Sequence, residues 1–391
     1  MADWLAAVFG GSSRPLSAIE LVERAQHRTG LTDFGGAPFE EPLRILSESL
    51  EREARLSAFG KMAARWDMVR FLSNLLMLRE AEKQRPAILR QAVDQPVFIT
   101  GLPRSGTTFL HHLFAQDPSN RFVRCWETIY PCAGTGRSAT PERRASKVER
   151  QLNIFARLAP EFRGVHPIGA TSPQECTEIT AHVFRSLRFD TTHDVPGYRT
   201  WLDRTGHLAA YRFHLRFLRH MQDGAAPGRW VLKSPDHVFA LDAIRAVFPD
   251  ARFIFMHRDP LDVLPSVAKL TEVLRGPFTR AVNRRAIGEQ VADRWARGAA
   301  ILVEEGRSGN PFSAHIQFRS LLRDPLGTVR RLYAWLGLQL CAESEARIRE
   351  AIPAWPQGKR RGGKTRLEEY GLNTDVVRGR YREYIASFDL Q

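Results

Sequence analysis

The sequence predicts an α/β fold, in which a P-loop-like parallel sheet lies between helices in three layers, with an all-helical extension at the amino terminus. Two observations support this prediction. From residue 95 onward, short apolar runs rich in β-branched residues alternate with helical patterns, which is typical of a parallel sheet. Residues 14–94 instead carry the apolar spacing of amphipathic helices. We therefore divide the chain into an extension, 1–94, and an α/β domain, 95–391.

The extension contains three predicted helices and no residues of evident chemistry. Ser17-Ala-Ile-Glu20 has the pattern of a capping box at a helix start, and Thr29-Gly30 ends that helix. Residues 43–50 and 65–81 repeat the helical spacing. We expect these helices to pack beside the α/β domain and to contribute one wall of a substrate pocket.

The first unit of the α/β domain combines a strand, a glycine-bounded loop and a helix. Residues 97–100 form the predicted strand, Gly101 and Gly106 enclose the loop, and the helix starts at Thr107. This arrangement gathers unpaired backbone N–H groups and the positive end of the helix dipole at one point. It is therefore suited to bind an anion such as phosphate. A plain glycine turn without a ligand is the alternative interpretation.

The loop differs at one position from the nucleotide triphosphatase pattern Gly-x4-Gly-Lys-[Ser/Thr]. Gly101, Gly106 and Thr108 fit the pattern, but Thr107 replaces the lysine that binds the β- and γ-phosphates. A different cation, Arg104, lies earlier in the loop. The loop therefore suits a nucleotide that has less charge at its reactive end and needs no metal.

A second informative segment, 229–260, reads as strand, helix and strand with short links. Lys233 and Arg258 each lie where one of these predicted strands ends. Because the carboxyl ends of parallel strands share one edge of a sheet, we expect both cations beside the glycine-bounded loop.

The remaining predicted elements complete the domain. They are a short strand at 122–126, an exposed mobile lid at 138–145, a helix after the start signal at 172–175, a helix at 285–306, a strand at 314–318, a helix at 326–336, a basic glycine-rich loop at 357–366 and a closing helix at 372–388.

Composition narrows the classes of function. The net charge of +14 and the pI near 10.2 favour anionic ligands, nucleic acids or anionic membrane surfaces without selecting among them. The four cysteines form no Cys-x-x-Cys pair and no cluster with histidine, which indicates a reducing compartment and no metal site. The sequence has no signal-peptide pattern and no apolar run of transmembrane length. We therefore expect a cytoplasmic protein with no integral membrane segment.

Four sequence blocks, in order, closely resemble the sulfotransferases that use 3′-phosphoadenosine 5′-phosphosulfate (PAPS), in particular the large bacterial-type family with a helical extension. The blocks are Gly-Leu-Pro-Arg-Ser-Gly-Thr-Thr (101–108), Leu-Lys-Ser-Pro-Asp-His (232–237), Arg-Asp-Pro-Leu-Asp-Val-Leu-Pro-Ser (258–266), and Leu-Leu-Arg-Asp-Pro (321–325) with Trp-Leu-Gly-Leu (335–338). The resemblance covers the chain from about residue 15 to its end. It implies transfer of a sulfuryl group from PAPS to a hydroxyl group.

The resemblance also implies which residues hold the donor. The 5′-phosphosulfate would lie on the loop, and the 3′-phosphate would lie between an arginine and a serine two helical turns later, unless that arginine pairs with Asp259 or Asp262. A phenylalanine would pack on the nucleotide where many relatives have a tyrosine, and the basic loop near the carboxyl terminus would close on the 3′-phosphate. The residues so implied are Arg104, Ser105, Gly106, Thr107 and Thr108 for the first group, Arg258 and Ser266 for the second, and Phe318, Arg361, Gly362 and Lys364 for the last two contacts.

The catalytic residues implied by the resemblance are a lysine and a general base. Lys233 corresponds to the lysine that neutralises the oxygen leaving with adenosine bisphosphate. Glu127 matches the catalytic glutamate of tyrosylprotein sulfotransferases and is our first candidate for the base, followed by His237 and then His112, with His111 as its neighbour.

Two other functions compete with this interpretation. An ATP-dependent small-molecule kinase would need the missing loop lysine and ligands for Mg²⁺. A nucleic-acid-binding protein is suggested by the positive charge, but the basic residues are dispersed and match no binding motif. We expect a small-molecule, lipid or carbohydrate acceptor and no nucleic acid. A homodimer is possible, and the sequence does not identify the acceptor.

Overall fold

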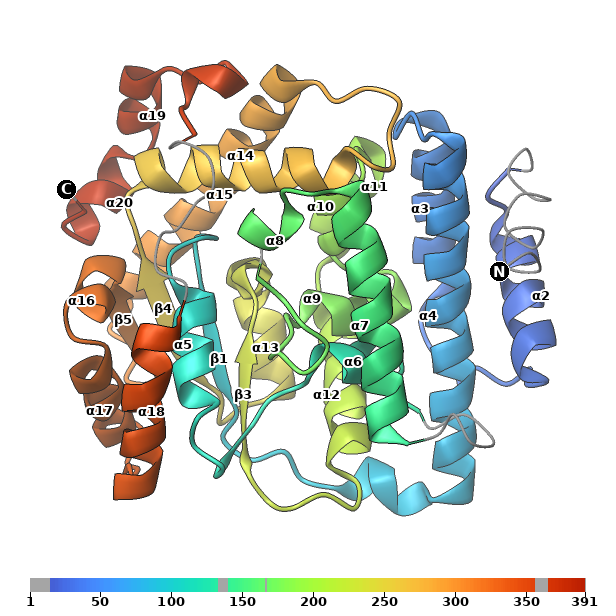
Figure 1. Cartoon of the computed structure of the whole chain (residues 1–391), viewed down its shortest axis with the longest axis horizontal. Helices are drawn as coiled ribbons and strands as arrows, with labels where there is room; N and C mark the ends of the chain where they lie inside the picture. The colour runs from blue at the N-terminus through green and yellow to red at the C-terminus, as the bar shows by residue number, and fades with distance from the viewer. Residues whose placement is uncertain (1–14, 133–139, 166, 356–364, 391) are drawn as a thin grey trace.

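The computed structural model describes residues 15–132, 140–165, 167–355 and 365–390. Its centre is a five-stranded sheet in the order β2-β3-β1-β4-β5, and each neighbouring pair is parallel. The strands are β1 (Val97–Gly101), β2 (Asn120–Arg121), β3 (Arg229–Lys233), β4 (Arg252–His257) and β5 (Ser313–Gln317). The predicted parallel sheet is therefore confirmed, and β1 occupies its middle (Figure 1).

Alternate side chains of the strands pack into two different hydrophobic clusters. On one face, Val97 and Ile99 of β1 pack with α5 (Thr107–Phe114), α16 (Phe318–Arg323), α17 (Pro325–Trp335) and α18 (Ala342–Ala354). On the other face, Phe98 joins a larger cluster that includes α12 (Leu208–Gln222), α13 (Leu241–Val247), α14 (Pro260–Arg275) and α15 (Arg284–Arg307). The two-residue period of a strand thus produces the three predicted layers.

The amino-terminal helices belong to this larger cluster. They are α2 (Ala18–Thr29), α3 (Glu40–Arg52) and α4 (Ala58–Gln84). Buried residues of α4, such as Leu72 and Leu76, lie in the same cluster as Phe98 of the sheet. The extension and the α/β domain therefore share one hydrophobic core. The division of the chain into two domains at residue 94 stays a prediction.

The predicted strand at 122–126 is wrong in its position. Strand β2 ends at Arg121, and Cys125–Ile129 forms the short helix α6. The Glu127 carboxylate accepts a hydrogen bond of 2.6 Å from the backbone N–H of Arg124 and so caps this helix. An apolar run of this length is compatible with either a strand or a short buried helix. Here the hydrogen bond from the Arg124 N–H to the Glu127 carboxylate stabilises the helix.

Two further predictions need correction. The predicted lid at 138–145 overlaps α7 (Pro141–Leu158), a regular helix capped by the Thr140 hydroxyl, while residues 133–139 lie outside the described ranges. The predicted single helix at 372–388 consists of two helices, α19 (Thr374–Arg380) and α20 (Arg382–Ser387), which are separated at Tyr381. The other helices are α8 (Phe162–Val165), α9 (Thr177–Thr180), α10 (Arg188–Thr192) and α11 (Pro196–Thr205), with 3-10 turns at Pro86–Arg90, Ala181–Val183, Pro235–Ala240 and Glu368–Tyr370.

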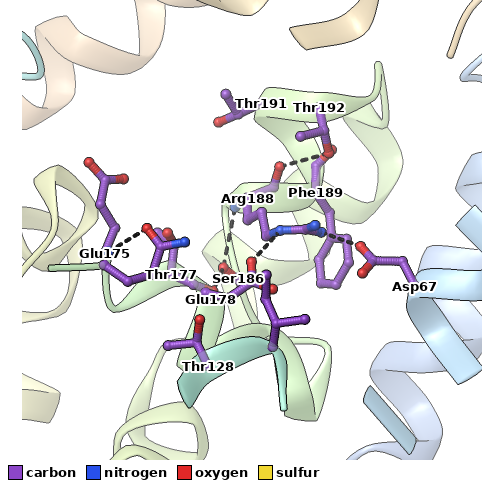
Figure 2. Close-up of polar contacts among 12 residues, drawn as sticks. Asp67, Thr128, Glu175, Thr177, Glu178, Ser186, Arg188, Phe189, Thr191 and Thr192 are labelled. Atoms are coloured by element: carbon purple, nitrogen blue, oxygen red, sulfur yellow. Dashed lines mark hydrogen bonds and ion pairs between the residues drawn. The ribbon is translucent and has the colours of Figure 1, made fainter. Parts of the chain in front are cut away.

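Four charged side chains join the extension to the α/β domain. Arg70 of α4 contacts Asp67 at 2.5 Å and Glu178 of α9 at 2.8 Å. Arg188 of α10 contacts the same two carboxylates, each at 2.6 Å, and Figure 2 shows it lying between them. We call these four residues the charge quartet. Burial would raise the pKa of Asp67, but the charges of Arg188 and Arg70 outweigh it and lower the pKa to about 2.

Replacing one arginine of the charge quartet should destabilise the fold. The Arg70 side chain is only 3% exposed, so Arg70→Met leaves buried carboxylates partly uncompensated and should lower the free energy of unfolding by about 3 kcal/mol. Urea unfolding measures the change. The control is Arg285→Met, which removes an exposed pair with Glu289 and should cost about 0.5 kcal/mol or less. Equal, small effects of both variants would contradict the role of the quartet.

Candidate active site

A cavity of about 1300 Å³ opens at the carboxyl ends of β1 and β3. The glycine-bounded loop and the start of α5 form one end of it, and α4, α7 and α14 surround the other. Ligand cavities in proteins are usually about 300–1,000 Å³. This cavity is therefore large enough to take more than one small molecule.

The loop between β1 and α5 is shaped by backbone conformations that few residues adopt. Arg104 and Gly106 have positive φ angles of 62° and 91°, and Gly106 directly precedes the helix. The Ser105 hydroxyl donates a hydrogen bond of 2.6 Å to the Leu102 carbonyl and so closes the turn. Thr107 is buried, and Thr108 borders the cavity. The first N–H groups of α5 thus point toward the loop, as an anion site requires.

Gly106 leaves room for an aromatic ring. A Cβ atom at this position would lie 2.6 Å from the Phe318 ring. Phe318 follows β5 and also borders the cavity. The glycine therefore satisfies two requirements, a positive φ and a close approach of the ring to the loop.

The two groups of residues predicted to bind the two ends of the nucleotide meet in the structure. Arg104 Nε donates a hydrogen bond of 3.2 Å to Ser266 Oγ, and Arg258 Nη1 donates one of 3.0 Å to the Arg104 carbonyl. The Arg258 guanidinium lies 4.5 Å from the centre of the Phe318 ring. It also contacts Asp262 at 3.3 Å, which is the alternative pairing considered from the sequence.

One N–H group of Arg258 in this cluster is available to bind a ligand. Arg258 Nε is buried and has no hydrogen-bond partner among the described residues. Arg104 and Arg258 border one cavity. The residues present therefore fit a ligand with anionic groups, such as a nucleotide with a 3′-phosphate.

Lys233 is a buried cation beside the glycine-bounded loop. It ends β3, its side chain is 1% exposed, and its Nζ lies 2.6 Å from Glu175 Oε1 and 3.2 Å from Thr108 Oγ1. Both partners border the cavity. A buried ammonium group is stable only beside groups that compensate its charge. The lysine has two such partners and so connects the glycine-bounded loop to the Glu175 carboxylate.

Sequence reasoning missed Glu175 as a functional residue. Its position depends on two backbone hydrogen bonds, from Gln174 N–H to the Val123 carbonyl at 2.8 Å and from Cys176 N–H to the Lys233 carbonyl at 3.0 Å. These hold residues 174–176 beside the end of β3. Glu175 lies 58 residues before its partner, and no local motif links the two. The sequence indicated only a helix start near this residue.

The four bases considered from the sequence lie elsewhere, and none of them borders the cavity. Glu127 caps α6, and burial raises its pKa. His237 is buried, contacts Tyr211 Oη at 2.5 Å, and has a pKa lowered well below its usual value by burial.

His111 Nε2 lies 3.0 Å from the Val231 carbonyl, and burial together with the charge of Lys233 lowers its pKa to about 3. The His112 ring lies 5.0 Å from that of Trp355, and burial lowers its pKa.

The remaining predicted nucleotide contacts are Arg361, Gly362 and Lys364, which lie outside the described residues. Within the described ranges, no group of three or more His, Cys, Asp or Glu side chains is arranged to hold a metal ion.

The far part of the cavity is mostly apolar. Helix α4 contributes Phe59 and Met62, α7 contributes Phe155, and α14 contributes Leu270 and Leu274. This part can therefore accommodate a hydrocarbon ligand.

Polar groups border the apolar part. All four members of the charge quartet do so, and in Figure 2 the Glu175 side chain points away from Glu178 and Arg188. Asp236 borders the cavity next to the β3 end, and burial raises its pKa to about 7.

Comparison with known proteins identifies the family. A family model for the sulfotransferase family matches residues 96–342, which is more than half of the chain. The chain belongs to the sulfotransferase family.

Relatives of this sulfotransferase are known from mycobacteria. The crystal structure of STF1 from Mycobacterium tuberculosis is similar with a TM-score of 0.82 and 28% identity, over 94% of this chain and 99% of STF1. STF9 from Mycobacterium avium gives a TM-score of 0.82 and 26% identity, over 97% and 98% of the two chains. The predicted fold class, including its helical extension, is confirmed by this similarity.

A curated relative is the omega-hydroxy-beta-dihydromenaquinone-9 sulfotransferase Stf3, known from Mycobacterium bovis and Mycobacterium tuberculosis. It is 27% identical to this sulfotransferase over 263 residues. The match spans 63% of this chain and 63% of the length of Stf3.

Filling the space above Gly106 should weaken nucleotide binding by this sulfotransferase. In Gly106→Ala, the new Cβ would displace the Phe318 ring, and we expect the Kd for adenosine 3′,5′-bisphosphate to rise by roughly tenfold or more. The control is Gly309→Ala, which has a positive φ of 60° but nothing within 4 Å of the added atom. Calorimetric titration of both variants separates the two effects. An unchanged Kd in Gly106→Ala would contradict the assignment of the loop.

Proposed function

We propose that this protein transfers a sulfuryl group from PAPS to the hydroxyl group of an apolar, lipid-like acceptor. The observation that carries the proposal is the junction at the end of β3. There the nucleotide-type loop, the buried Lys233 and the Glu175 carboxylate meet at one end of a cavity whose other end is apolar.

In this proposal, PAPS supplies an activated sulfuryl group whose sulfur–oxygen bond to adenosine bisphosphate breaks. The loop, with Arg104, Ser105 and the first N–H groups of α5, holds the 5′ end of the nucleotide. Arg258 and Ser266 hold its 3′-phosphate. The support for this orientation is the hydrogen bond between Arg104 and Ser266, which joins the two groups, and the unpartnered Arg258 Nε among the described residues.

Lys233 has the role of neutralising the oxygen that leaves with adenosine bisphosphate. A fixed cation there stabilises negative charge as it develops in the transition state. The side chain is withdrawn from solvent, so its interaction with that charge is screened little.

Glu175 is the general base of this proposal. It takes the proton of the acceptor hydroxyl while the acceptor oxygen forms its bond to sulfur. A base must lie within hydrogen-bond reach of that proton, and the Glu175 carboxylate lies at the cavity 2.6 Å from Lys233. Glu127, our first candidate from the sequence, caps α6 outside the cavity lining. We therefore prefer Glu175.

Two observations support an apolar acceptor. The cavity wall far from Lys233 is built from aromatic and aliphatic side chains of α4, α7 and α14. The relative Stf3 is named as acting on an omega-hydroxy derivative of dihydromenaquinone-9. Family membership also favours this function over the kinase and the nucleic-acid-binding alternatives.

The direct test of the proposal is an assay with labelled PAPS and a long-chain alcohol such as farnesol, alongside calorimetric titration with adenosine 3′,5′-bisphosphate. We expect the bisphosphate to bind and label to appear in the alcohol. A folded protein that binds ATP with Mg²⁺ but not the bisphosphate would contradict the proposal.

Removing the proposed base should slow turnover without weakening nucleotide binding. Glu175→Gln keeps the size of the side chain but cannot accept the proton, so kcat should fall by about 10²- to 10⁴-fold. The Gln amide oxygen can still accept the hydrogen bond from Lys233 Nζ, so the lysine stays in place and the Kd for adenosine 3′,5′-bisphosphate should stay within about threefold, which corresponds to less than 1 kcal/mol.

The matched variant is Glu127→Gln, whose amide oxygen can still accept the Arg124 N–H bond that caps α6, so stability should change by less than about 1 kcal/mol with little change in kcat. Thermal unfolding of both variants checks that they fold. A large loss of kcat in Glu127→Gln together with normal turnover in Glu175→Gln would reverse the assignment.

A further inference from the structure

The mouth of the cavity is surrounded by exposed apolar side chains. Trp66 of α4 is 41% exposed, and Ile154 and Leu158 of α7 are 50% and 48% exposed, yet all three border the cavity. Among the described residues, eight large apolar side chains are exposed, and four of these border the cavity. Exposed apolar groups are therefore concentrated at this opening, and such concentrations mark interaction sites.

Helix α7 is attached through part of its surface and exposes two apolar side chains beside the cavity. On the inner face, Val148 is buried, and Arg144 donates hydrogen bonds to the Tyr130 and Pro131 carbonyls. Ile154 and Leu158 are one helical turn apart on the side of the helix that borders the cavity, where both are half exposed, and we call this side the outer face. The helix lies across the front of the molecule beside α4 in Figure 1. The free apolar face is thus continuous with the cavity mouth.

Positive charge accompanies this apolar face. Arg150 and Arg157 are exposed on α7, and neither forms an ion pair with a carboxylate of the described residues. Arg150 is one turn before Ile154, and Arg157 directly precedes Leu158. The segment 141–163 contains six basic and three acidic residues. Apolar side chains flanked by arginines on one helix are typical of helices that lie on anionic membranes.

We propose that Trp66 and the outer face of α7 dock on the surface of an anionic phospholipid bilayer, so that an acceptor lipid enters the cavity directly from the membrane. The charge of the face is complementary to anionic headgroups, and its apolar residues lead into the apolar part of the cavity. No helix in the described part of the chain is long and apolar enough to cross a bilayer.

This inference rests on the proposed function for its biological meaning, but its test needs no turnover. The purified protein is sedimented with vesicles of phosphatidylcholine and with vesicles that contain about 30% phosphatidylglycerol. We expect at least about fivefold more binding to the anionic vesicles, and a loss of this preference at high salt.

Matched variants locate the contact. The double variant Ile154→Ser with Leu158→Ser should lower binding to anionic vesicles by roughly tenfold or more. The control is Ile19→Ser with Val376→Ser, which replaces side chains that are 73% and 68% exposed and lie outside the cavity lining. This control should bind vesicles like the unaltered protein. Titration with adenosine 3′,5′-bisphosphate confirms that both double variants are folded.

Three results would overturn the inference. The first is a protein that binds the bisphosphate but no vesicles, which leaves the proposed function standing. The second is equal loss of vesicle binding in both double variants. The third is a dimer in sedimentation analysis that Ile154→Ser with Leu158→Ser dissociates, because the face would then contact a second copy of the chain. Failure to bind the bisphosphate would instead count against the proposed function.

Discussion

A lysine ammonium withdrawn from solvent requires a fixed counter-charge, and the pair of Lys233 with Glu175 meets this requirement at the end of β3. The rest of the site depends on this pair. It fixes the carboxylate beside Thr108 and hence beside the nucleotide-type loop. It also draws residues 174–176 against β3, where the Cys176 N–H donates to the Lys233 carbonyl. The pair therefore links the nucleotide-type loop to the carboxylate at the cavity.

The helical extension also helps to form this site. Arg70 and Asp67 of α4 close the charge quartet with Glu178 and Arg188, while apolar residues of α4 form a wall of the cavity. Glu178 lies three residues after Glu175. The segment that positions the proposed base is thus anchored by the extension, and this gives the extension a role in the site as well as in the core.

Part of the proposed site follows from local sequence patterns. The loop 101–108, Lys233 and the Arg258–Ser266 spacing follow from residue order and from the shared edge of parallel strands, and the structure brings them together. Glu175 could not be predicted in this way, because only the tertiary fold brings it to Lys233. The sequence favours Glu127 because it predicts a strand just before it, but β2 ends at Arg121 and the chain turns into α6. The apolar wall of the cavity is likewise assembled from three helices that are distant in the sequence.

The measurement that tests this account most directly is a crystal structure with adenosine 3′,5′-bisphosphate bound. The account predicts the 5′-phosphate on the loop, within hydrogen-bond distance of Lys233 Nζ, and the 3′-phosphate on Arg258 and Ser266. It also predicts the Glu175 carboxylate facing the apolar part of the same cavity. A nucleotide bound in the opposite orientation, or at a site away from Lys233, would contradict it.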